Sequence, residues 1–467
     1  MTPTRRHPAR RPGPVRGAAW PLTVLLVLST LWGTGLPAAR AHAATPPDDP
    51  VRALSAAARP LRTTEPHGPD RDLAAFGAMV GPATVVGFGE ATHSSHEFFA
   101  LKHRAFRYLV EHRGFRGFSL EAPWSTGLRL NDYLLRGRGD PLRIFREDFQ
   151  DAYLFWRTWE YLDLIHWMRA YNVAHPHDPV QFSGNDIGYA GPELYDRVTG
   201  YVRATRPALL PEVERLYRGL RPTLPAGEHM RAYATRPLAE RREAVRRTHR
   251  VVELLTARRP GRGAAAREAH TWAVRHAVSL EQTARQYAYD FDDPDDVRRS
   301  MSYRDRIMAE NTVWWHRQTG AKVLLSAHNG HVFYVNYEPG FPDIQGAFLR
   351  DLLGSRYLAV GLTFHHGSAN ATRLEDPLVD ENVRTVTLGP PPSGTNEYTL
   401  DRVPHRDFLI DMRTAPAAAR DWLARPRPSR MFGTAYPVPD AVLALGESAD
   451  VLVHLHQVRA ADRLPFR

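Results

Sequence analysis

Six acidic and imidazole side chains stand directly after apolar runs of the sequence, where predicted strands end. Histidine accepts a proton near neutral pH, and a neighbouring carboxylate fixes the tautomer of the ring and stabilises its charged form. Such a pair can remove a proton from water, so these residue types predict hydrolysis by a histidine-activated water molecule. The six residues are Glu90, His93, Glu121, Asp186, His328 and His331.

A covalent serine or cysteine mechanism is not indicated. The segment Gly117–Glu121 contains the nearest candidate serine, but Ser119 lies within a predicted strand and the second glycine of a nucleophile elbow is missing. The sequence contains no cysteine, which excludes a thiolate nucleophile and a zinc–thiolate site. Attack by activated water is therefore favoured over an acyl-enzyme.

A metal site on the same residues is the alternative. Glu90, His93, His328 and His331 are all competent ligands, and two histidines with one carboxylate are a familiar zinc set. Their spacing does not match the i, i+4 pair of a helical zinc motif. We therefore expect no bound metal and no other cofactor, with a metal-dependent hydrolase as the second hypothesis.

Two apolar runs, Thr84–Gly89 and Phe115–Leu120, predict buried strands around a helix that ends at Gly114. A strand–helix–strand unit of this length makes parallel strands with a right-handed crossover. Open α/β sheets place their ligands beyond the carboxyl ends of such strands. The polar residues that follow the two runs should therefore meet at one edge of the sheet.

The helix between these strands carries Lys102 in the middle of its apolar face. A buried ammonium group needs an acidic partner, unless the side chain extends to water. Lys102 and Lys322 are the only lysines among 61 lysine and arginine residues. This bias favours a role for Lys102 that arginine would not fill.

The remaining patterns predict an α/β fold, with a mostly parallel sheet core flanked by helices and an inserted helical subdomain. The inserted segment has long helical runs rich in alanine, arginine and glutamate, and it is expected to form a lid or wall of the site. Later strand patterns occur at Pro179–Ser183, Ala321–Ser326, Tyr357–Phe364, Phe408–Met412 and Asp450–Leu455, the last two as edge strands. The predicted organisation is a signal peptide at 1–43, core at 44–190, helical insertion at 191–320 and core at 321–467.

The N-terminal segment predicts export. Five arginines precede an apolar stretch from Ala18 to Leu36, and small residues suited to cleavage follow it. An uncleaved anchor is the alternative, because the apolar stretch approaches the length of a membrane span. No later stretch is apolar for long enough, so we expect a secreted or extracytoplasmic protein without a membrane span after cleavage.

The net charge of +10 does not predict nucleic-acid binding. Five of the basic residues belong to the predicted signal, and many others lie on helices among glutamates. The expected partner is a small-molecule ester, and a monomer is expected.

Several motifs resemble the erythromycin esterase family, in order from about residue 70 to the C-terminus. The resemblance implies an α/β core with a helical insertion, and an activity that opens the lactone ring of macrolide antibiotics with water and without an evident metal requirement. Relatives in the family include proteins described as similar to succinoglycan-biosynthesis proteins. The motifs are Gly-Glu-Ala-Thr-His at 89–93, Glu-Phe-Phe at 97–99, Leu-Lys-His at 101–103, Glu-Ala at 121–122, Asp186, and Ala-His-Asn-Gly-His at 327–331.

The resemblance also implies roles for individual residues. His93 would be the general base, with Glu90 and Glu121 orienting it or the water, and His328 would be a second essential histidine. Lys102 would stabilise an oxyanion or pair with a carboxylate. Residues expected to support or bind the substrate are Asp186, Asn329 and His331.

Together these inferences predict an exported hydrolase that cleaves a carboxylic ester, with a macrolide lactone, and hence antibiotic resistance, as the candidate substrate and role. A third hypothesis from a different class is a non-catalytic envelope protein that binds a polysaccharide or another ligand in the same cleft.

Overall fold

The computed structural model describes residues 49–257, 259–338, 340–341 and 343–465. The predicted signal peptide, residues 1–43, lies outside these residues, so export stays a prediction. Within the described ranges, no helix combines the length and apolar character that a membrane crossing requires.

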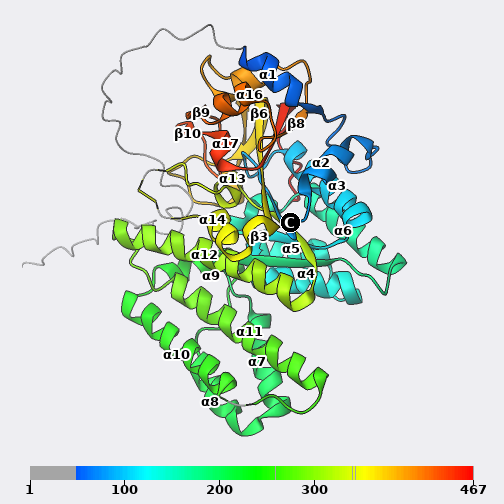
Figure 1. Cartoon of the computed structure of the whole chain (residues 1–467). Helices are drawn as coiled ribbons and strands as arrows, with labels where there is room; N and C mark the ends of the chain where they lie inside the picture. The colour runs from blue at the N-terminus through cyan, green and yellow to red at the C-terminus, as the bar shows by residue number, and fades with distance from the viewer. Residues whose placement is uncertain (1–48, 258, 339, 342, 466–467) are drawn as a thin grey trace, which may run out of the picture.

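A mixed sheet runs through the centre of the upper part of the molecule (Figure 1). In the described residues its order is β1–β8–β11–β6–β2–β5–β3–β4, with β7 paired to β6. The strands from β11 to β4 are parallel, whereas β8, β1 and β7 join through antiparallel pairs. The strands are β1 (Arg59–Pro60), β2 (Val85–Phe88), β3 (Phe115–Pro123), β4 (Gln181–Asp186), β5 (Lys322–Ser326), β6 (Tyr357–Ala371), β7 (Arg384–Leu388), β8 (Phe408–Asp411) and β11 (Val451–Val458), and a separate pair is β9 (Arg427–Ser429) with β10 (Ala441–Leu443).

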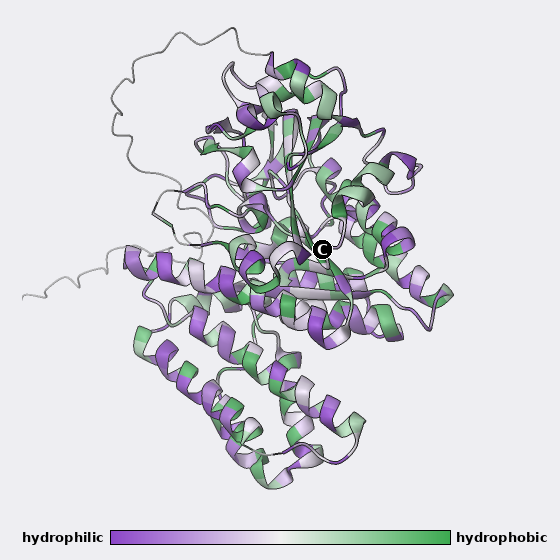
Figure 2. Ribbon diagram, in the orientation of Figure 1, coloured by the Kyte–Doolittle hydropathy of each residue, from purple (hydrophilic) through white to green (hydrophobic). Residues whose placement is uncertain are grey.

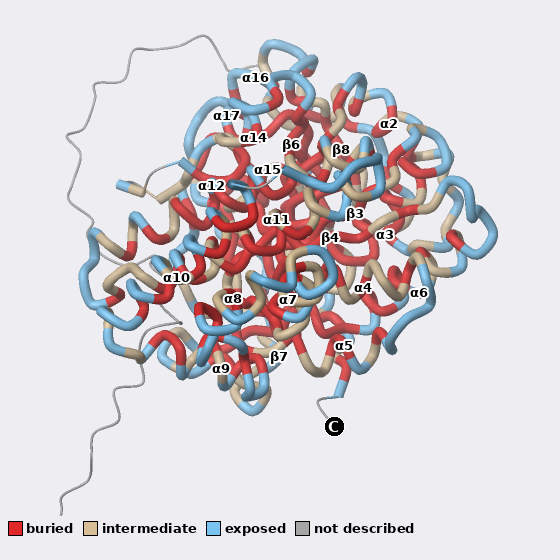
Figure 3. Tube along the Cα trace, turned by 90° about the horizontal axis from the view of Figure 1, so that it is seen from below, coloured by how far each residue is buried: buried red, intermediate tan, exposed pale blue. Residues whose placement is uncertain are grey.

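Helices pack around this sheet and confirm the predicted α/β class. The tube in Figure 3 shows that buried backbone is concentrated on the strands and the helices next to them. The helices are α1 (Pro50–Ala57), α2 (Ala74–Val80), α3 (His96–Arg113), α4 (Trp124–Arg136), α5 (Pro141–Asp148), α6 (Trp159–Ala174), α7 (Pro192–Thr205), α8 (Leu210–Tyr217), α9 (Ala226–Ala234), α10 (Leu238–Thr256), α11 (Ala264–Gln286), α12 (Pro294–Thr319), α13 (Asn329–Val332), α14 (Gln345–Leu353), α15 (Asn396–Leu400), α16 (Ala417–Leu423) and α17 (Leu445–Ser448).

The described residues between β4 and β5 form helices α7 to α12 and no strand. Figure 1 shows α7, α8, α10 and α11 as a bundle at the lower end of the molecule, with α12 between this bundle and the sheet. Green and purple residues alternate along these helices in Figure 2, as expected for amphipathic helices that bury one face. In α10 the buried positions Ala244, Thr248, Val251 and Leu255 recur every three or four residues. Helix α12 is thereby held next to β4 and β5, where it can reach the strand ends.

The predicted unit around β2, α3 and β3 is present. Helix α3 ends at Gly114, whose φ of 69° lies in the left-handed region that glycine adopts without strain. The apolar face of α3 packs on the sheet, with the rings of Phe106 and Phe118 5.2 Å apart. Strand β5 inserts between β2 and β3, so the ends of all three strands are neighbours.

Two strand predictions were wrong. Neither β8 nor β11 is an edge strand, because β8 lies between β11 and β1 in the sheet. Strand β6 does not end at Phe364 but continues to Ala371, since its second half pairs with β7 as well as with β11.

Candidate active site

The six predicted side chains lie at the carboxyl ends of neighbouring parallel strands. Glu90 and His93 follow β2, and His328 and His331 follow β5. Glu121 lies close to the carboxyl end of β3, which finishes at Pro123, and Asp186 is the final residue of β4. The structure thus brings all six to one edge of the sheet.

Glu90 connects His93 to Lys102. The Nδ1–H of His93 donates to Glu90 Oε1 at 2.8 Å, because a carboxylate can only accept. Lys102 donates to Glu90 Oε2 and, at 3.3 Å, to the carbonyl oxygen of Ala327. Both Glu90 and Lys102 are fully buried. In the neutral ring, this hydrogen bond places the proton of His93 on Nδ1, so that Nε2 carries the lone pair that can accept a proton.

Lys102 therefore pairs with a carboxylate and does not extend to water. Burial lowers the pKa of Lys102, and the charge of Glu90 opposes that shift. The side chain does not line the cavity described below. Of the two roles implied for Lys102, the structure supports carboxylate pairing and not contact with an oxyanion.

The rings of His93 and His328 are neighbours, with centroids 4.9 Å apart, and Trp156 lies edge-on to His93 at 5.0 Å. Nδ1 of His328 accepts from the backbone N–H of Gly330 at 3.2 Å, so the proton of the neutral ring is on Nε2. Burial lowers the pKa of His328 well below its usual value, and the nearby His93 adds to this effect. His328 is therefore a neutral imidazole at pH 7.

Arg304 of α12 connects two of the predicted carboxylates. Its Nε donates to Asp186 Oδ1 at 2.9 Å, and its Nη2 donates to Asp186 Oδ2 at 2.5 Å and Glu121 Oε1 at 3.0 Å. Glu121 Oε2 accepts from the backbone N–H of His328 at 3.0 Å. Burial alone would raise the pKa of Glu121, but His331, His93 and Arg304 hold it well below its usual value. Glu121 therefore stays ionised and fixes the start of the loop after β5.

His331 lies between two carboxylates. Its Nδ1 is 2.6 Å from Asp305 Oδ1 and its Nε2 is 3.2 Å from Glu121 Oε1. Burial opposes the charged form, but Asp305 and Glu121 raise the pKa of His331 to about 10. The raised pKa favours the imidazolium form of His331 at neutral pH, in which Nε2 donates to Glu121, although Nη1 of Arg304 lies 3.1 Å from the same nitrogen.

The charge of His331 predicts a pH dependence of stability. The folded-state pKa lies above the unfolded value of about 6.5, so the stabilisation is fully present below pH 6.5 and is lost as the pH rises through about 10. In urea titrations between these pH values, the wild-type free energy of unfolding should fall, and the His331→Asn variant should lack this part of the decrease. The exposed His177, changed to Asn, is the control and should follow the wild type. Identical slopes for all three proteins would contradict the assignment.

A cavity of about 80 Å³ opens beside the two neighbouring histidines. One water molecule needs roughly 10–15 Å³ of such space, so the cavity holds several waters. Its walls include His93, Arg304, Asp305, His328, His331 and Glu338.

Asn329 does not line this cavity. Its Nδ2 donates to the carbonyl of Leu362 at 2.8 Å, and its Oδ1 accepts from the N–H of the same residue at 3.1 Å. Its backbone N–H donates to the carbonyl of Glu90. The predicted substrate contact of Asn329 is therefore not supported, because its side chain is used to join the loop after β5 to β6. Asp186 is likewise held away from the cavity by Arg304.

The cavity residues that sequence reasoning missed include Arg304, Asp305 and Glu338. Arg304 and Asp305 lie in the middle of α12, where a charged pair is typical of any helix, and only their burial distinguishes them. Glu338 follows α13, and burial raises its pKa to about 7. The one feature of the sequence that could have drawn attention to Arg304 and Asp305 is their position, because these adjacent opposite charges lie where the helical insertion returns to the core.

Known proteins resemble this chain in sequence and in fold. The erythromycin esterase family model matches residues 110–458. Erythromycin esterase type II of Escherichia coli is 22% identical over 384 residues, covering 76% of this chain and 87% of that protein. A solved succinoglycan biosynthesis protein superposes with a TM-score of 0.77 at 27% identity, covering 88% of this chain and 97% of the other.

A mutant erythromycin esterase in its open conformation has the same fold, with a TM-score of 0.67 at 17% identity, over 88% of this chain and 99% of the other. The family model covers well over half of the sequence, including the ends of β3, β4 and β5, and it begins after Glu90, His93 and Lys102. The chain therefore belongs to the erythromycin esterase family.

Proposed function

We propose that this protein is an exported carboxylic ester hydrolase in which His93 activates the attacking water, with a macrolide lactone as the candidate substrate. The observation that carries the proposal is the Glu90–His93 hydrogen bond beside a cavity large enough for several water molecules. Family membership supports hydrolysis of an ester in general, and the predicted signal segment supports export.

His93 has the geometry of a general base. Its Nδ1–H is held by the buried carboxylate of Glu90, and its ring lines the cavity. As Nε2 takes the proton of a water molecule, the imidazolium that forms is stabilised by Glu90. Lys102 neutralises Glu90 on the opposite oxygen and keeps the carboxylate in place.

His328 has the opposite role in this proposal. Its Nε2 is buried, and no described residue meets both the distance and the angle needed for a hydrogen bond with it. A neutral ring with its proton on Nε2 can donate to the oxygen that gains negative charge during attack. Holding the ring neutral also avoids a second cation beside His93 while His93 is protonated.

The size of the cavity limits how the substrate is bound. Pockets that enclose a drug-sized ligand usually measure about 300–1,000 Å³. The space beside His93 accommodates an ester group and the attacking water, so the bulk of a macrolide would lie outside it. The cavity therefore supports an ester as the reacting group, and a macrolide remains the candidate for the whole substrate.

Metal-dependent hydrolysis on the same residues is the weaker alternative. Both oxygens of Glu90 already have cationic or N–H partners, and both ring nitrogens of His331 face carboxylates. A bound ion would have to displace these partners. Activity measured before and after chelation separates the two mechanisms, since a water activated by His93 alone does not need an ion.

The function is tested by incubating the purified protein with a panel of simple esters, lactones and macrolides. Hydrolysis should appear in mass spectra as the gain of one water by the substrate, and it should be much slower with the His93→Gln variant. Complete lack of turnover, together with thermal stabilisation by an envelope polysaccharide, would instead favour the non-catalytic binding protein.

A further inference from the structure

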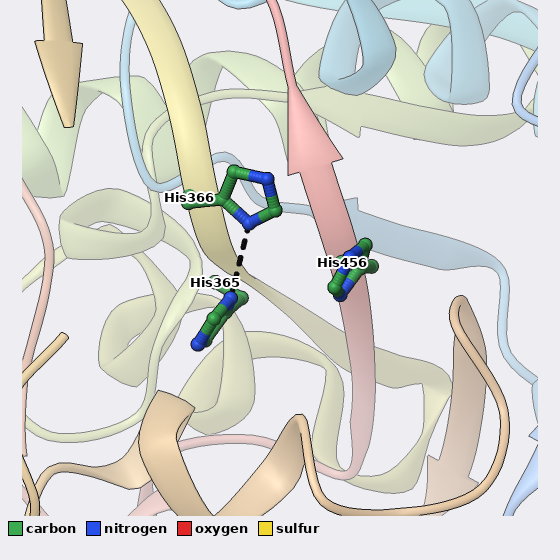
Figure 4. Close-up of side chains that lie close together, drawn as sticks. All are labelled: His365, His366 and His456. Atoms are coloured by element: carbon green, nitrogen blue, oxygen red, sulfur yellow. Dashed lines mark hydrogen bonds between the residues drawn. The ribbon is translucent and has the colours of Figure 1, made fainter. Parts of the chain in front are cut away.

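Three histidines form a second cluster away from the residues that surround His93. His365 and His366 belong to β6, and His456 lies on the adjacent parallel strand β11 (Figure 4). None of the three is fully buried. The proposed hydrolysis uses none of them.

The ring nitrogens of this cluster are close enough to share one ion. Each ring offers a nitrogen, and the three nitrogens lie within 4.8 Å of one another. Nδ1 of His365 is 3.0 Å from Nδ1 of His366, which Figure 4 marks with a dashed line. Zinc–nitrogen bonds of about 2.0–2.1 Å place two tetrahedral ligands roughly 3.3 Å apart, so this pair is already near the required separation.

The carboxylate of Asp401 contacts two of the three histidines. Asp401 Oδ1 is 2.7 Å from Nδ1 of His456, and its Oδ2 is 3.4 Å from Nδ1 of His365. The hydrogen bond to Asp401 leaves Nε2 of His456 with its lone pair. Histidines that bind metals commonly donate their other N–H to a carboxylate in this manner.

The backbone explains why consecutive residues of a strand can join one cluster. Gly367, directly after the pair, has a φ of 139°, and a Cβ atom there would lie 1.8 Å from the carbonyl oxygen of Val458 in β11. The glycine therefore allows β6 and β11 to approach each other closely at this point.

A metal ion binds the lone pair of an imidazole nitrogen, and each of the three rings offers one such nitrogen within reach of the other two. The other two groups of potential ligands in the described residues contain one histidine each, His112 or His96, with carboxylates. The three-histidine cluster is therefore the better match for an ion that prefers imidazole.

We propose that His365, His366 and His456 form a binding site for a divalent transition-metal ion of the zinc class, with Asp401 as the positioning residue. Three nitrogen ligands leave the fourth position of a tetrahedral ion to water or to another ligand. Such an ion joins β6 to β11. The site is separate from the ligand set considered for a metal-dependent hydrolase, and zinc binding here does not depend on the proposed ester hydrolysis.

Zinc titration calorimetry on full-length protein tests this site, with the protein purified without a histidine tag and freed of metal with a chelator. The wild type should bind one zinc ion and unfold at a higher temperature in its presence. The His366→Asn and His456→Asn variants should bind at least about tenfold more weakly, and Asp401→Asn should lose about 10–100-fold in affinity.

Two controls separate this site from others. His93→Asn and the exposed His177→Asn should bind zinc as the wild type does. Cobalt(II) in place of zinc should give a visible absorption band in the wild type that His456→Asn lacks. Absence of zinc binding by the wild type would overturn the proposal, as would unchanged binding by the cluster variants or loss of binding in His93→Asn. If a cluster variant fails to fold, Asp401→Asn, which keeps all three histidines, supplies the same comparison.

Discussion

The His93→Gln variant is expected to lose about 10²–10⁴-fold in kcat with the substrate that the ester panel identifies. The structure gives the reason, because Glu90 holds Nδ1 of His93 and leaves Nε2 beside the cavity as the proton acceptor. An amide at this position can occupy a similar volume but cannot accept the proton of water. Steady-state kinetics on the two folded proteins measure the effect.

Two further measurements make this result specific. The exposed His177→Gln variant should keep wild-type turnover, and circular dichroism should show that His93→Gln is folded. In the His93→Ala variant, added imidazole should restore part of the activity, since it can fill the space of the missing ring. Turnover close to the wild type in His93→Gln would show that His93 is not the general base. Equal losses in His93→Gln and His177→Gln would show the same.

The Arg304→Met variant is expected to lower the free energy of unfolding by about 3–5 kcal/mol. Arg304 is the buried cation that bonds to both Asp186 and Glu121, so its loss leaves two buried carboxylates with fewer partners. The charge of Arg304 also fixes Glu121, which holds the N–H of His328. Equilibrium unfolding in urea measures the stability, and turnover should fall together with it.

The same helix offers a matched control. Arg299 pairs with Asp296 on the exposed side of α12, with 61% of its side chain accessible. An exposed ion pair contributes little to stability because water and salt screen it, so Arg299→Met should have little effect. Adding Asp186→Asn to Arg304→Met should recover part of the lost stability, because one unpaired charge is removed. Equal destabilisation by the two arginine variants would show that the network around Asp186 and Glu121 does not carry the predicted energy.

Buried charged residues hold the two histidines proposed to act in catalysis. His93 is set by Glu90 and Lys102, and His328 is set by Glu121 and, through it, by Arg304. Two adjacent histidines are thus held by separate buried carboxylates, His93 through its Nδ1–H and His328 through its backbone N–H. Variants in the supports should change the pH dependence and stability of the site as well as its rate.

Much of the fold could be predicted because the relevant signals are local. The alternation of apolar runs and helical periods located β2, α3, β3 and β5, and Gly114 marked the end of α3. Strand edges were harder, since whether β11 is at the edge depends on β8 and β1, which are distant in the sequence. The continuation of β6 through His365 and His366 was missed for the same reason, because it rests on pairing with β7.

The sequence by itself determined that Glu90, His93, Glu121, Asp186 and the two histidines after β5 lie at one edge of a parallel sheet. That follows from strand direction, which a strand–helix–strand pattern fixes without knowledge of distant contacts. Only the tertiary structure decided which charges are paired there. A helical pattern shows that a residue faces inward but not what it meets, so the contacts of Lys102 with Glu90 and of Arg304 with Asp186 emerged only when α3 and α12 were packed against the strand ends.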